Sequence, residues 1–184
     1  DVRVSNVIVT IDGRPAAEVY DEWRGGILEP GWQGVGQDIM METSNDPLGI
    51  EIEGEAGVSY FRLLQPGFVL ADGSLRCFAA VRLGDRVHVM RGSKDGLVRR
   101  AASVVASATG TARRGSDAVA GGIVVYCVGC RLAVGDGIDR VVDALGAGFD
   151  GQPFIGCFTG GEQGPVLGNA IHANLMISAV VFGE

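Results

Sequence analysis

Short β-type segments follow one another along this chain, often with no helical segment between them. They are rich in β-branched or alternating apolar residues and cover 2–11, 50–52, 60–64, 75–81, 86–91, 123–128, 153–159 and 175–182. Runs of adjacent strands exclude a fold in which strand and helix strictly alternate. The pattern therefore predicts an α+β fold with a mixed, mainly antiparallel sheet.

About three helices are expected to pack on this sheet, because three segments repeat apolar residues at helical spacing. The first follows Pro15 and ends at Gly25. The second follows Ser93 and the third follows Asp136, and both of these side chains are predicted N-caps.

Segments 27–47 and 109–121 lack a clear period and are predicted to be loops, the first with a short helix near Met40. Trp32 and its apolar neighbours in the first loop have two interpretations. They form an exposed interface for another protein, or the loop folds back over the sheet and buries Trp32 internally.

Composition narrows the class of protein. A chain of 184 residues is predicted to be one domain, spanning 1–184. The net charge of -7 and the pI near 4.8 argue against binding nucleic acid. No apolar run reaches the ~18 residues of a membrane span, and residues 1–11 show no signal-peptide pattern. Four cysteines are too few for a disulfide scaffold, so we expect an acidic cytoplasmic protein.

Cys127 and Cys130 form a CxxC motif, which can be a redox dithiol or half of a zinc site. A redox pair needs its first thiol at a helix N-terminus, whereas the next predicted helix starts about nine residues after Cys127. A zinc site needs a second ligand pair, which is missing. Core packing is therefore the preferred interpretation, as it is for Cys77 and Cys157, and a thiol redox protein is kept as an alternative.

Polar residues follow the last predicted strands, where such groups commonly line a pocket. Glu162 lies between Gly161 and Gln163 in a glycine-rich stretch, and His172 and Asn174 precede the final strand. The simpler interpretation is an exposed carboxylate and a structural histidine. Two histidines cannot make a multi-histidine metal site, and neither a nucleophile elbow nor a P-loop is present. Catalysis is therefore less expected than binding.

Several segments, taken in order, resemble the FIST C domain, the C-terminal half of the FIST sensory domains. They are Ile11-Asp12-Gly13-Arg14-Pro15-Ala16, Asp46-Pro47-Leu48-Gly49, Asp72-Gly73-Ser74-Leu75, Cys127-Val128-Gly129, the Gly-Glu-x-Gly-Pro stretch that ends at Pro165, and His172. Two positions depart from the family pattern. Cys130 stands where an arginine is usual, with Arg131 one place later, and Gln163 replaces an apolar residue.

The resemblance implies a small-molecule-binding sensory domain of signal transduction, with an amino acid or similar metabolite as ligand. The implied ligand-binding residues are Cys127, Gly129, Cys130, Arg131, Gly161, Glu162, His172 and Asn174. Some relatives look like haem-based nitric oxide sensors, for which His172 or His88 would be the axial ligand. The implied partner is a FIST N-terminal domain or a second subunit.

Overall fold

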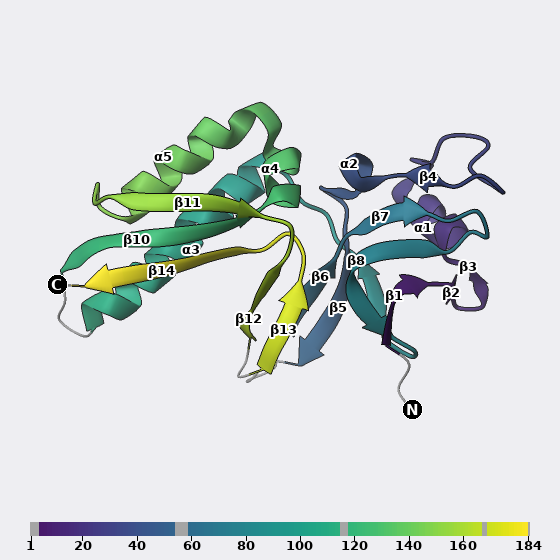
Figure 1. Cartoon of the computed structure of the whole chain (residues 1–184), viewed down its shortest axis with the longest axis horizontal. Helices are drawn as coiled ribbons and strands as arrows, with labels where there is room; N and C mark the ends of the chain where they lie inside the picture. The colour runs from purple at the N-terminus through teal and green to yellow at the C-terminus, as the bar shows by residue number, and fades with distance from the viewer. Residues whose placement is uncertain (1–3, 54–58, 115–117, 167–168, 184) are drawn as a thin grey trace. The chain divides into compact units, whose positions relative to one another are not determined.

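The computed structural model of the chain describes residues 4–53, 59–114, 118–166 and 169–183 (Figure 1). The chain divides into two compact units. The first unit comprises residues 1–91 and 163–174, and the second comprises 92–162 and 175–184. No helix within the described residues is long and apolar enough to cross a bilayer.

The first unit is built mainly from antiparallel strands. One sheet has the order β1-β8-β7-β4, formed by Val4–Ile8, Leu75–Arg82, Pro66–Val69 and Gln37–Asp38. A second sheet has the order β6-β5-β9, formed by Ser59–Leu64, Leu48–Glu53 and Val87–Val89. The strands β2 (Thr10–Ile11) and β3 (Arg14–Pro15) form a hairpin whose turn is Asp12-Gly13, and both turn residues have positive φ.

Helix α1 (Ala16–Arg24) packs its apolar stripe into the core of the first unit. Tyr20 is fully buried, and its hydroxyl donates a hydrogen bond to the carbonyl oxygen of Asp46 at 2.6 Å. The helix ends at Gly25, whose φ of 80° is the left-handed conformation that glycine adopts at least cost. Both predicted ends of this helix are confirmed.

The loop that follows α1 folds back onto the same core. Trp32 is 8% exposed and Ile39 is fully buried, and a short helix, α2 (Met40–Thr43), is present where it was expected. Of the two interpretations of this loop, internal burial of Trp32 is therefore correct, and the exposed interface at Trp32 is wrong.

The second unit is a three-stranded sheet covered by helices (Figure 1). Strand β10 (Val119–Cys127) pairs in parallel with β11 (Phe154–Thr159) and antiparallel with β14 (Ile177–Gly183). Helix α3 (Lys94–Arg114) packs on β14 and on α5 (Ile138–Gly148), which follows a 3-10 turn at Gly135–Gly137. In the chain, β12 (Glu162–Val166) and β13 (Asn169–Ala173) lie between β11 and β14 and pair with each other, and apart from Glu162 they belong to the first unit.

The predicted α+β class is confirmed, since the structure combines helices with mainly antiparallel strand pairs and the one mixed sheet of the second unit.

Several element boundaries differ from those predicted. A strand begins at Pro66, outside the predicted strands, and α3 continues to Arg114 through part of an expected loop. Asp136 does not cap α5, whose N-cap is Gly137 without a side-chain bond. The predicted cap Ser93 is confirmed, because its hydroxyl accepts the Gly96 N–H at 3.1 Å.

Candidate functional site

The CxxC motif lies at the junction of β10 and a helix that the sequence did not predict. Cys127 ends β10, and α4 (Val128–Val134) begins at the next residue, not about nine residues later. Val128 was assigned to the strand because it ends the continuous apolar run that begins at Ile123. The local geometry of a redox dithiol is therefore present, contrary to the sequence argument.

The chemistry of the two thiols nevertheless opposes a redox role. Cys127 is 4% exposed and Cys130 is fully buried. Burial raises the pKa of Cys127, although backbone N–H groups at the start of α4 oppose the shift. Burial, with Cys127 and Glu162 nearby, raises the pKa of Cys130 to about 12. A thiol with a raised pKa is a poor nucleophile near neutral pH, so the structure favours core packing.

Glu162 is buried and its carboxylate is already bonded. Only 6% of the surface of Glu162 is exposed. One carboxylate oxygen, Oε1, accepts the Thr159 hydroxyl at 2.7 Å, and Oε2 accepts the Met176 N–H at 3.3 Å. The carboxylate therefore ties the end of β11 to the start of β14, which is a structural role within the second unit.

Gly129 and Arg131 also have local roles in the second unit. Gly129 is buried in the first turn of α4. Nη1 of Arg131 donates to the carbonyl oxygen of Gly135 at 2.9 Å, so the guanidinium satisfies a backbone group at the end of α4. Gly161 lies beside Glu162, immediately before β12.

The remaining two predicted residues belong to the first unit. His172 is exposed on β13. Asn174 is 2% exposed. Its side-chain Oδ1 accepts a hydrogen bond from the Gln65 N–H at 3.0 Å, and its backbone N–H donates to the Leu63 carbonyl oxygen at 3.1 Å. Asn174 therefore extends the backbone bonding of β6, and only His172 of these two is open to solvent.

The surroundings of the two histidines give no support to a haem site. The His88 ring packs edge-on against Phe61, with ring centroids 5.3 Å apart, and its Nε2 is buried without a hydrogen-bond partner. Neither His88 nor His172 lines the pockets described below. Within the described part of the chain, no three histidine, cysteine or acidic side chains are grouped to hold a metal ion.

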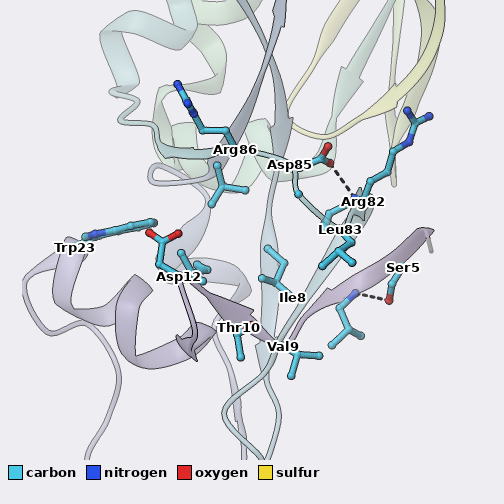
Figure 2. Close-up of a pocket in the computed structure, with 15 residues that line it drawn as sticks. Ser5, Ile8, Val9, Thr10, Asp12, Trp23, Arg82, Leu83, Asp85 and Arg86 are labelled. Atoms are coloured by element: carbon cyan, nitrogen blue, oxygen red, sulfur yellow. Dashed lines mark hydrogen bonds between the residues drawn. The ribbon is translucent and has the colours of Figure 1, made fainter. Parts of the chain in front are cut away.

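A pocket of about 730 Å³ lies in the first unit, and no residue of the predicted set lines it (Figure 2). This volume is in the range of small-molecule sites. The lining comes from β1, the Asp12 turn, α1 and the β8–β9 turn: Ser5, Val7, Ile8, Val9, Thr10, Ile11, Asp12, Trp23, Val81, Arg82, Leu83, Gly84, Asp85, Arg86 and Val87. A second hollow of about 270 Å³ shares Trp23 and Val87 with it.

The pocket has an apolar body and charged groups of both signs. Ile8 and Ile11 are buried in the core, whereas the Trp23 ring is 39% exposed. Figure 2 places Trp23 and Asp12 toward the same end of the pocket. Among the described residues, neither the Asp12 carboxylate nor the Arg86 guanidinium has a hydrogen-bond or ion-pair partner. A free carboxylate, a free guanidinium and an aromatic ring can together bind a molecule that carries both charges.

Sequence reasoning missed this pocket because its lining residues are scattered along the chain. Asp12 was identified only as part of a segment that resembles the family, and Arg86 only as the start of a strand. Helical spacing places Trp23 on the same face of α1 as Val19 and Tyr20, yet Trp23 is 39% exposed and lines the pocket.

Comparison with known proteins gives one result. Residues 16–165 match the model of the family described as FIST C domain. No curated protein and no solved structure matches the chain.

Proposed function

The chain belongs to the FIST C domain family, a family of sensory domains in signal transduction, and we propose that it senses a small zwitterionic metabolite such as an amino acid. The observation that supports this ligand is the pocket of Figure 2, which offers the free Asp12 carboxylate near the Trp23 end. We treat residues 1–184 as one sensory domain and expect it to act in the cytoplasm.

The ligand's ammonium group would bind at the end that contains Asp12 and Trp23. A carboxylate accepts charge-assisted hydrogen bonds from an ammonium group, and the face of an indole ring attracts a cation. Arg86, which has no ion-pair partner among the described residues, would bind the ligand's carboxylate. Ile8 and Ile11 line the same pocket with little exposed surface, and they would contact the apolar part of the ligand.

Isothermal titration with a panel of amino acids and related metabolites tests the proposal. Asp12→Asn is the informative variant, because asparagine tolerates the φ of 50° at this turn and removes only the charge. A charge-assisted hydrogen bond contributes about 1.5–3 kcal/mol, so we expect affinity to fall by roughly 10- to 150-fold. Asp143→Asn, an exposed aspartate on α5, is the matched control.

Two outcomes would contradict the proposal. Unchanged affinity in Asp12→Asn would exclude this pocket as the site. The residues predicted from the sequence are the alternative location, and His172→Ala tests them because His172 is exposed and its loss is not expected to unfold the chain. A ligand that depends on His172 and not on Asp12 would move the site there.

A further inference from the structure

The pocket of Figure 2 is larger than a free amino acid needs. Its volume is about 730 Å³, and a non-hydrogen atom at the packing density of protein interiors occupies roughly 20 Å³, so the pocket has space for about 35 such atoms. The largest free amino acids have only about 15 non-hydrogen atoms and would leave more than half of the volume to water. A ligand that contacts the whole pocket is therefore about twice as large.

The pocket also follows the length of an extended segment. Side chains of successive strand residues point to opposite faces, so a pocket on one face of a strand touches every second residue. Here Val7, Ile8 and Val9 line the pocket in succession, and the next three residues continue the lining to the Asp12 turn. Strand β1 is the end strand of its sheet and pairs only with β8 among the described residues. The lining therefore favours an extended ligand that lies along this segment.

Free charges lie toward opposite ends of the pocket. Figure 2 places Asp12 with Trp23 at one end and Arg82 with Ser5 at the other. The Arg82 backbone N–H donates to Asp85 at 2.9 Å, but the Arg82 guanidinium has no hydrogen-bond or ion-pair partner among the described residues. In a free amino acid the ammonium nitrogen and the carboxylate carbon are about 2.5 Å apart, whereas each residue of an extended peptide adds about 3.3–3.6 Å. A longer ligand can therefore place one charge toward each end.

Apolar side chains with exposed surface lie between these two ends. Val9 and Leu83 both line the pocket, and they are 60% and 91% exposed. Figure 2 places both between the Trp23 end and the Arg82 end. Contact with a ligand would remove this apolar surface from water, which is favourable. A free amino acid carries one side chain, whereas a peptide carries several that can cover both residues.

We propose that the ligand is a short peptide, about two to four residues long by the length of an extended chain, and not a free amino acid. The inference rests on the proposed function, because it uses the same pocket and the same contact of Asp12 with an ammonium group. The peptide's N-terminal ammonium binds at Asp12 and Trp23. Its C-terminal carboxylate reaches Arg86 or, in a longer peptide, Arg82.

Isothermal titration of the full chain tests the length of the ligand. The probes are alanine, dialanine, trialanine and tetra-alanine, and the same series of leucine up to trileucine. We expect the affinity to rise at least tenfold from the amino acid to the tripeptide. N-acetyl-trialanine lacks the ammonium group, so it should bind at least tenfold more weakly than trialanine, and Asp12→Asn should remove this difference.

Arg82→Gln tests whether the ligand extends to the far end of the pocket. We expect this substitution to weaken tetra-alanine binding several-fold and to leave the affinity for alanine unchanged, because an amino acid bound at Asp12 does not reach Arg82. Arg99→Gln, at an exposed arginine on α3, is the matched control. Circular dichroism checks that each variant is folded. An unchanged affinity for tetra-alanine in Arg82→Gln would contradict the extended placement.

The remaining outcomes separate this inference from the proposed function. If amino acids bind in a manner that depends on Asp12 and the peptides bind no more tightly, the peptide ligand is wrong while the proposed function stands. If peptides bind equally well to the chain and to Asp12→Asn, or if no member of either series binds, both are overturned.

Discussion

Substitution of Glu162 separates a structural carboxylate from a ligand-binding one. In Glu162→Ala, the Thr159 hydroxyl and the Met176 N–H both lose the acceptor that the structure gives them. Hydrogen bonds to a charged group contribute about 1.5–3 kcal/mol each, and an unpaired donor away from water carries its own cost. Thr159 and Met176 are only partly buried, so water compensates in part. We therefore expect the substitution to lower the free energy of unfolding by about 2–4 kcal/mol.

The loss is measured as a fall in Tm. For a chain of this size 1 kcal/mol corresponds to about 2–4 °C, so Glu162→Ala is expected to melt roughly 5–15 °C lower by circular dichroism. Glu42→Ala is the control, because Glu42 is exposed on α2, and its Tm should stay within about 2 °C of the original. A double-mutant cycle with Thr159→Val isolates the bond between these two side chains.

The opposite result would refute this reasoning. Residues that serve binding often cost stability, and their removal then stabilises the protein. If Glu162→Ala melts at the original temperature or above it while ligand affinity falls, Glu162 is a binding residue and the sequence-based site is correct.

Other predictions follow from burial. Only Cys157 should react quickly with iodoacetamide in dilute native protein at pH 8, and a second fast thiol would contradict the burial of the others. The pKa of the Cys130 thiol is raised to about 12 in the folded chain, whereas an unfolded cysteine has a pKa of ~8.5. The stability that the buried thiol contributes is therefore fully present below pH ~8.5 and is lost as the pH rises toward 12. Urea titrations across this pH range would detect the loss. Trp32→Ala should destabilise the chain by about 3–5 kcal/mol without changing its sedimentation, and an unchanged Tm would show that the loop is not packed. Gly122→Ala places a Cβ 2.2 Å from the Phe149 ring and 2.7 Å from the Val180 carbonyl oxygen, so it should cost about 1–3 kcal/mol or more in denaturant titrations, whereas Gly160→Ala, with open space, should cost far less.

Local signals in the sequence were sufficient for the features that depend on neighbouring residues. The positive φ of the Asp12-Gly13 turn, the left-handed Gly25 at the end of α1 and the Ser93 cap of α3 are all set by side chains within a few positions. The alternating apolar strands and the order of elements also follow from local pattern, which is why the α+β class was predictable.

Boundaries without such a signal were not predictable. The apolar run that ends β10 continues into α4 with no polar cap or proline at Val128, so helix and strand are equally consistent with the local residues. The run from Phe154 to Phe158 looks like a core strand, but β11 lies at an edge of its sheet, and Cys157 and Ile155 are exposed.

By itself, the sequence determined the class of fold, the helical and extended segments, and the resemblance to a sensory family. Tertiary structure alone decided which strand lies at an edge, which thiols are buried and which residues line a cavity. Asp12, Trp23 and Arg86 line one pocket although they come from three separate segments, and Glu162 gains its bonding partners only when β11 and β14 flank β10. Both depend on pairings between residues far apart in the chain, and these are stabilised by burial of the whole core and not by the local sequence.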